Sequence, residues 1–199
     1  MTEAPRTYPR HVDCGAAAVA IDRMTPADQG DLVRFIAALP PEDLLFVPRD
    51  ITHPKVIDAW MQALQTGHIA SLTARVDGVL VGCTSIYTDR MSWSRHVGEL
   101  RVLVAAGTRG QGIGRALIQE CFLQALELGL AKLVAHMTTN QARAIAVFED
   151  LGFRPEALLS GHVADRAGAL HDLVILSHDV RAVAARHAAY GLGDSVAAG

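Results

Sequence analysis

The feature that most constrains this chain is a glycine-rich segment, Arg109-Gly110-Gln111-Gly112-Ile113-Gly114, which lies between two apolar runs. The run before it ends in Val102-Leu103-Val104 and is typical of a strand, and the run after it has the pattern of a helix. Glycines expose backbone N–H groups, and at a helix N-terminus such groups bind anions such as pyrophosphate. The segment therefore predicts a strand–turn–helix unit that binds a nucleotide-type cofactor.

Two better-known glycine loops do not fit the segment. Gly107 and Gly112 have the spacing of a Walker loop, but Ile113-Gly114 stands where that loop needs Lys and a hydroxyl residue. A dinucleotide-binding fingerprint requires glycine where Arg115 stands. It also requires an acidic residue after the next strand, where the sequence has Thr138-Thr139-Asn140. The Walker loop is excluded and the dinucleotide fold is disfavoured.

The remaining pattern, Arg/Gln-x-x-Gly-x-Gly at a strand-to-helix junction, resembles the GNAT superfamily of acyl-CoA-dependent N-acyltransferases. Residues 97–104 resemble the fourth strand of that family, and 130–137 resemble its fifth. Residues 144–153 are similar to its next helix, which closes in Gly-Phe. The resemblance covers about residues 97 to 155. It implies acetyl-CoA or another acyl-CoA as cofactor, and transfer of the acyl group to an amine acceptor.

Hydrophobic periodicity and turn residues predict the other elements. Thr25-Pro26 opens a helix with one apolar face, and His53-Pro54 opens a second helix that stops at Gly67. Asp77-Gly78 between two β-rich runs predicts a type I′ hairpin. Strands are expected over 16–22, 68–76, 79–88, 97–104, 130–137, 153–163 and 169–179, and helices over 26–39, 54–66, 113–128 and 141–151.

This order of elements predicts an α/β (α+β) fold in a single domain, residues 16–180. The central sheet is expected to be mixed and largely antiparallel, with helices on both faces. The family resemblance adds two splayed central strands, between which the acyl-CoA arm enters. Residues 1–15 are expected to form an irregular lead-in, Pro41–Thr52 a loop, and 181–199 a flexible tail.

Composition narrows the partners. The net charge of −3 and the absence of a Lys/Arg-rich run argue against nucleic acid. No apolar stretch is long enough for a bilayer and the start lacks a signal-peptide pattern, so we expect a cytoplasmic protein without a membrane partner. Cys14, Cys83 and Cys121 are scattered, and the histidines lack ligand spacing, so neither a disulfide framework nor a metal is expected. A homodimer is left open.

The resemblance assigns chemistry to the strand before the loop. It implies Glu99 as the general base, often acting through water. The alternative is an exposed ion pair with Arg101, which shares its strand face. Val102 would supply an oxyanion-binding N–H, and Val104 would bond the pantetheine amides, with Leu103 between them. The side chains of Val102 and Val104 are predicted to be core residues.

Further residues would bind the cofactor. The resemblance implies that the pyrophosphate is held, chiefly by main-chain N–H groups, by Arg109, Gly110, Gln111, Gly112, Ile113, Gly114 and Arg115. For Arg115 the alternative is a solvated residue of the first helical turn. Asn140 would lie near the pantetheine, or else cap the next helix.

One position departs from the family pattern. Phe148 stands where many relatives have a Tyr that protonates the departing thiolate, and phenylalanine has no proton to donate. Tyr87 is a candidate substitute, with strand packing as the alternative, and His136 and Asp165 are reserve bases. The departure keeps a second class of function in play, a non-catalytic acyl-CoA-binding sensor or scaffold. The identity of the acceptor and the preferred acyl chain are not encoded in any pattern we can read.

Overall fold

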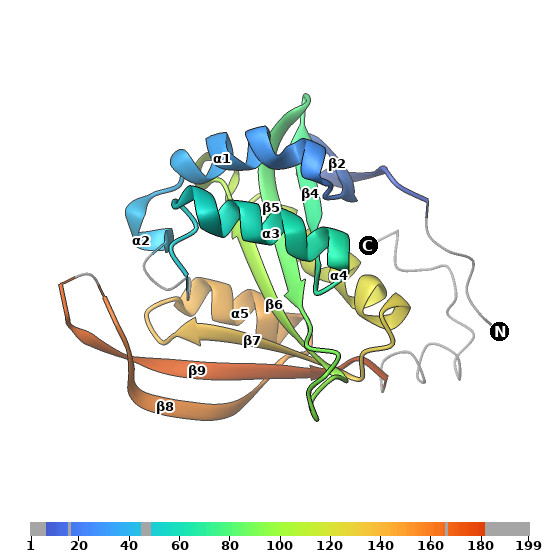
Figure 1. The fold of residues 1–199 in the computed structure, drawn as a ribbon. Coiled ribbons are helices and arrows are strands. Elements are labelled where there is room, and N and C mark those ends of the chain that lie inside the picture. The colour runs from blue at the N-terminus through green and yellow to red at the C-terminus, as the bar shows by residue number, and fades with distance from the viewer. Residues whose placement is uncertain (1–6, 16, 45–48, 166, 182–199) are drawn as a thin grey trace.

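The computed structural model describes residues 7–15, 17–44, 49–165 and 167–181 (Figure 1). Its strands form one sheet in the order β1-β2-β4-β5-β6-β7-β9-β8, with β3 beside β5. Within the described residues β6 and β7 pair in parallel and the other neighbours pair antiparallel. The strands are β1 (Arg10–Cys14), β2 (Ala17–Arg23), β3 (Ile69–Ala70), β4 (Leu72–Val76), β5 (Val79–Tyr87), β6 (Val97–Val104), β7 (Lys132–Thr138), β8 (Arg154–Ala164) and β9 (Leu170–Asp179).

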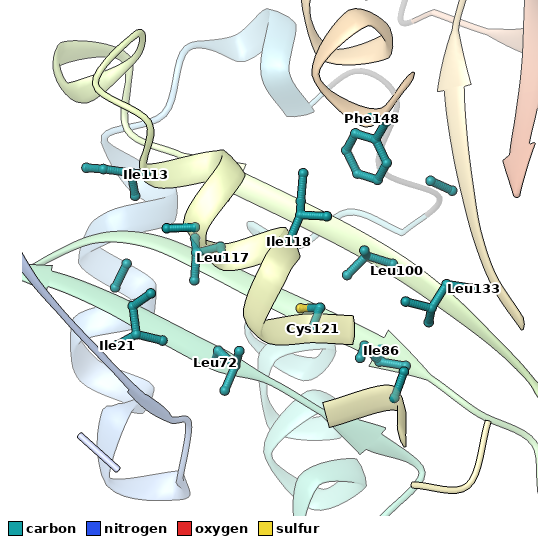
Figure 2. Packing of buried hydrophobic residues seen from close by; sticks show 14 of the residues in the cluster. Ile21, Leu72, Ile86, Leu100, Ile113, Leu117, Ile118, Cys121, Leu133 and Phe148 are labelled. Atoms are coloured by element: carbon teal, nitrogen blue, oxygen red, sulfur yellow. The ribbon is translucent and has the colours of Figure 1, made fainter. Parts of the chain in front are cut away.

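Helices cover both faces of the sheet. The helices are α1 (Gln29–Ala37), α2 (Pro41–Leu44), α3 (Pro54–Thr66), α4 (Ile113–Glu127) and α5 (Ala142–Asp150), with 3-10 turns at Pro26–Asp28 and Ala106–Thr108. One apolar cluster joins α4 and α5 to the sheet through Leu117, Ile118 and Phe148 (Figure 2). A second joins α1 and α3 to the opposite face through Leu32 and Trp60. The expected mixed sheet with helices on both faces is confirmed.

Local sequence signals explain the element boundaries. In α3, Pro54 occupies the first turn and Gly67 ends the helix with a φ of 72°. Glycine adopts that left-handed conformation without the penalty that a Cβ brings. The turn between β4 and β5 has φ values of 49° at Asp77 and 78° at Gly78, as a type I′ turn requires. The predicted hairpin is therefore confirmed.

The expected irregular lead-in is wrong for residues 10–14, which form β1. These residues pair antiparallel with β2 from Arg10↔Ile21 to Cys14↔Ala17. Val12 and Cys14 turn toward the core while His11 and Asp13 are exposed, which is the alternation of an amphipathic strand. The prolines and glycine around this short run hid its period.

Two further expectations change at loops and ends. The segment Pro41–Thr52 was expected to be a loop, but it begins with α2, a single turn opened by a proline at its first position. The expected flexible tail, 181–199, lies outside the described residues except for Arg181. In the described chain, no helix is both long and apolar enough to cross a bilayer.

A glycine fixes the position of β6 within the core. A Cβ added at Gly98 would lie 2.7 Å from Leu130 Cδ1 and 2.8 Å from Ile86 Cγ2, closer than packed atoms approach. The absence of a side chain at Gly98 therefore lets β6 lie close against the connection that follows α4. Since Glu99 is the next residue, this packing also sets where its side chain emerges.

Candidate active site

The site begins where the two central strands stop pairing. The parallel register of β6 and β7 ends at Glu99↔Val134. In the described chain, β6 then continues to Val104 and β7 to Thr138, each paired with its outer neighbour, β5 or β9. The central strands thus separate at Glu99, which agrees with the splay that the family resemblance implies.

Main-chain donors of β6 face this separation. The N–H of Ala105 donates to the Val81 carbonyl oxygen of β5 at 2.8 Å. Successive residues of a strand direct their N–H groups to opposite sides, so those of Val104 and Val102 point away from β5 and toward β7. The side chains of Val102 and Val104 pack against the α4/α5 cluster, as predicted, and Leu103 packs against the α1/α3 cluster.

The glycine loop follows β6 and opens α4. Gly110 and Gly112 have φ values of 78° and 89°, and Gly112 is the N-cap of the helix without a side-chain capping bond. A Cβ added at either position would meet no atom within 4 Å. The first-turn N–H groups have no partner within an α-helix, so the loop presents main-chain donors to open space. The predicted strand–turn–helix unit is confirmed.

The other loop residues frame this anion-binding turn. Ile113 is 1% exposed, so it contributes its backbone to the loop and its side chain to the core. A Cβ added at Gly114 would touch only Val104 Cγ2, at 3.6 Å, which places the first turn of α4 against the end of β6. The carbonyl oxygen of Gln111 would lie 3.7 Å from a Cβ added at Gly15, beside the connection between β1 and β2.

Both arginines of the loop already have acidic partners. Arg109 forms an ion pair with Asp43 of α2 and also donates to the Val104 carbonyl oxygen at 3.4 Å. Arg115 lies 3.0 Å from Asp150 of α5 in an exposed pair. In this structure Arg115 is thus a solvated residue of the first helical turn, the alternative considered for it. Main-chain N–H groups are the loop donors without such a charged partner.

The ion pair with Arg101, the alternative considered for Glu99, is present in the structure. Arg101 donates to Glu99 Oε1 from Nε at 3.0 Å and from Nη2 at 2.7 Å. His136 of β7 approaches the same oxygen with Nδ1 at 3.7 Å. The Glu99 side chain is 21% exposed, so it is reached by solvent yet held between two basic groups. Glu99 can thus accept a proton at the point where the strands separate.

Tyr87, the candidate donor to the thiolate, and Phe148, which stands at the family's usual Tyr position, lie on opposite faces of the sheet. Tyr87 pairs with Glu99 across β5 and β6, so its side chain lies on the Glu99 face, and it is 46% exposed. Strand packing in the core is therefore not its role. Phe148 is 5% exposed and belongs to the α4/α5 cluster (Figure 2). Its ring centroid lies 4.8 Å from that of Phe153. Tyr87 thus does not lie beside Phe148.

Asn140 joins a polar chain instead of capping a helix. Gln141 occupies the N-cap of α5 and accepts from the Thr138 N–H at 3.0 Å. The Asn140 side chain lies 3.1 Å from His171 Nδ1, and His171 Nε2 lies 2.9 Å from Asp165 Oδ2. The hydrogen bond from His171, together with backbone N–H donors, holds the pKa of Asp165 below its usual value. Asp165 is thus a structural acceptor in the β8–β9 hairpin rather than a base beside Glu99.

The cysteines are buried, as predicted. Burial raises the pKa of the Cys83 and Cys121 thiols to about 12, and it also raises that of Cys14. A thiol in that state is not a nucleophile near neutral pH. In the described part of the chain, no group of three or more His, Cys, Asp or Glu side chains is placed to hold a metal ion.

Comparisons with known proteins agree with this geometry. A family model described as "Acetyltransferase (GNAT) family" matches residues 33–153. An IAA acetyltransferase from Azospirillum brasilense is 34% identical over 94 residues, which are 47% of this chain and 60% of that protein. A protein of Bacillus subtilis (strain 168) named "Putative phosphinothricin acetyltransferase YwnH" is 30% identical over 82 residues, which are 41% of this chain and 50% of that protein. The chain thus spans only half to three-fifths of the curated relatives it matches.

Solved structures share the fold over most of the chain. A ribosomal-protein-alanine N-acetyltransferase from Brucella melitensis is 26% identical, covers 80% of this chain and is itself covered to 98%, with a TM-score of 0.71. The structure of yncA from Salmonella typhimurium, solved with its cofactor acetyl-CoA, is 22% identical and covers 81% of this chain and 94% of its own, with a TM-score of 0.69. The second likeness shows the fold alone.

Proposed function

Because the chain belongs to the GNAT acetyltransferase family, we propose that it transfers an acetyl group from acetyl-CoA directly to a primary amine, with both substrates bound together. The observation that carries this proposal is the end of the β6–β7 pairing at Glu99, immediately before the glycine loop. Strand separation and open loop are the two features that a long acyl-CoA arm and its pyrophosphate require. The cofactor seen with yncA is consistent with the same choice.

The residues present fit acyl-CoA. Gly110 and Gly112 leave open space in front of the first turn of α4, where main-chain N–H groups favour a pyrophosphate. Val104 directs its N–H toward the strand separation and would bond the pantetheine arm, with Asn140 at the far edge. When bound, acyl-CoA supplies an acyl group activated as a thioester. Phe148 contributes an apolar wall from α5.

The amine must lose a proton before it can attack. For a lysine-like amine with a pKa of about 10.4, the neutral form costs about 4.6 kcal/mol at pH 7. We assign the proton to the Glu99 carboxylate, directly or through water, because this group stands at the separation of the strands. Contacts from Arg101 and His136 hold the Glu99 carboxylate in this position. Val102 would aim its N–H at the developing oxyanion.

Direct transfer needs no covalent carrier on the protein. The described cysteines are buried, and their raised pKa values leave them protonated near pH 7. Departure of the CoA thiolate also needs little help, since a thiol of pKa about 8.5 is a tolerable leaving group. The chain can therefore dispense with the hydroxyl that Phe148 lacks.

Phe148 nevertheless supports one competing function, a sensor that binds acyl-CoA without turnover. A thiol-release assay with acetyl-CoA separates the two. Since the relatives are named for different acceptors, the panel should contain IAA, phosphinothricin, peptides with an N-terminal alanine, lysine peptides and small amines. Thiol release that requires one acceptor supports the enzyme. Tight acetyl-CoA binding without thiol release for any acceptor in the panel would reject the enzyme in favour of the sensor.

A further inference from the structure

A cavity lies at the opposite end of α4 from the glycine loop. Its volume is ≈ 520 Å³, and it is bordered by the loop between β5 and β6, the end of α4 and Arg181, two residues after β9. The lining residues are Arg90, Trp93, Arg95, His96, Leu128, Gly129 and Arg181. Since α4 has 15 residues and rises 1.5 Å per residue, the two sites are separated by about 22 Å along its axis.

The arginines of this cavity lack the ion pairs that most other described arginines form. Within the described residues, ion pairs engage Arg10, Arg23, Arg34, Arg75, Arg101, Arg109 and Arg115. Arg90, Arg95 and Arg181 form none in the part of the chain that the structure describes. The cavity thus brings together three arginines that form no ion pair among the described residues, on a protein whose net charge is −3.

Stabilisation of the helix end does not account for so much charge. The C-terminus of α4 carries about half of one negative charge from its dipole, which a single cation would offset. Three arginines line the cavity beside it instead. Guanidinium groups pair with phosphate oxygens in a bidentate geometry, so three neighbouring arginines outside the described ion pairs favour a phosphate at this end of α4.

The loop that carries these groups is held in shape. The N–H of Met91 donates to Asp89 Oδ1 at 3.0 Å, and that of Val97 donates to the Ser94 carbonyl oxygen at 2.8 Å. The His96 carbonyl oxygen accepts from the Ala131 N–H at 2.9 Å, which ties the loop to the start of β7. Arg90 and Arg95 are therefore presented from a hydrogen-bonded loop backbone.

An aromatic platform stands beside the charge. Trp93 borders the cavity and is 93% exposed, whereas the other tryptophan, Trp60, is 9% exposed and donates to Ser71. Burying so large an indole against a flat ring is favourable, and stacking on nucleobases is a common use of exposed tryptophan. We propose that this cavity binds a nucleoside phosphate, with the phosphates on the arginines and the base on Trp93.

The two tryptophans provide a direct test that does not depend on acyl transfer. The full chain is first saturated with CoA to fill the glycine loop, and ATP is then titrated at low salt while fluorescence and heat are recorded. Since only Trp93 is exposed, we expect saturable quenching with a dissociation constant below about 1 mM. The same binding should persist in Gly112→Asp, which separates this site from the acyl-CoA site.

Variants decide the assignment. Arg95→Gln and Arg90→Gln should each lower the affinity for ATP at least about tenfold, because each removes a charge-assisted contact. Arg143→Gln is the matched control, since Arg143 is exposed on α5 outside the cavity. Absence of saturable binding, or loss of it in Gly112→Asp, would overturn the proposal. Equal ATP affinity in the parent and both arginine variants would also overturn it. So would a parent protein and a Trp93→Ala variant that each bind ATP and tripolyphosphate with the same affinity.

Discussion

The two ends of α4 are built on opposite principles. At its N-terminus, Gly110 and Gly112 remove side chains, and the arginines nearby are already paired, so backbone N–H groups face the open space. At its C-terminus, side chains supply the charge, since Arg90, Arg95 and Arg181 border a cavity without ion pairs of their own among the described residues. A backbone site holds a phosphate by geometry and tolerates little change in the chain. A side-chain site holds it by charge and should lose affinity in steps.

The largest effect should follow from filling the backbone site. Gly112→Asp places a carboxylate where a pyrophosphate belongs, and we expect CoA affinity to fall by about 100-fold or more, measured by calorimetry. The left-handed φ of 89° adds a folding cost of about 1–2 kcal/mol.

Gly78→Asp is the control for Gly112→Asp. Gly78 has a φ of 78° with no atom within 4 Å of an added Cβ, and it lies in the β4–β5 turn. This variant should carry a similar folding cost and keep CoA affinity. Unchanged affinity in folded Gly112→Asp would mean that the loop is not the phosphate site.

The next effect concerns the strand separation next to the backbone site. Glu99→Gln should lower kcat by about 100-fold at neutral pH with CoA affinity retained, because the amine loses its proton acceptor. Raising the pH should recover part of the rate as the free amine becomes abundant.

Glu127→Gln provides the comparison for Glu99→Gln, since Glu127 also pairs with an arginine, Arg23, but lies on α4. It should leave kcat unchanged. If Glu99→Gln stays within about twofold of the parent from about pH 6 to 9, Glu99 serves only as the partner of Arg101.

A smaller effect tests whether the two ends are independent. Glu120 lies in the middle of α4, is 5% exposed, and accepts from Tyr8 at 3.2 Å and from Arg10 at 2.5 Å. Glu120→Gln keeps the shape but loses the charge, so unfolding should cost about 1–2 kcal/mol less, as measured in denaturant. Ligand binding at both ends should not change. If CoA and ATP affinity fall together in Glu120→Gln, binding at both ends of α4 depends on the stability of the helix, and the two sites are not independent.

The smallest effect is expected at Phe148. Phe148→Tyr adds a hydroxyl to a side chain that is 5% exposed beside Phe153, and we expect kcat to change less than about tenfold. Turnover that appears only in the Tyr variant, with none in the parent, would establish the sensor in place of the enzyme.

Sequence patterns predicted the conformation of the glycine loop and its flanking strand and helix because these signals are local. The φ values of Gly110 and Gly112, and the strand and helix on either side, are encoded within a few neighbouring residues. The same is true of the Asp77-Gly78 hairpin and of the α3 boundaries. The predicted pair of Glu99 and Arg101 also formed, because alternation along β6 places both side chains on one face.

The side-chain site escaped prediction because its residues are distant in sequence. Arg90, Arg95 and His96 do not form a basic run, and Arg181 joins them only after β9 has crossed the sheet. The approach of His136 to Glu99 likewise depends on the register of β6 and β7, and the pairing of Arg109 with Asp43 depends on the unforeseen α2. The strand β1 was missed because its apolar period is short.

Hydrogen exchange with and without acetyl-CoA tests the central claim, that main-chain donors of β6 and α4 hold this cofactor. Amide exchange should slow at Val102 and Val104 and in residues 110–115, because a bound ligand would protect N–H groups that face the strand separation and the loop. Exchange over residues 89–96, at the other end of α4, should not change. Protection confined to residues 89–96, with none along β6 or the loop, would contradict the account.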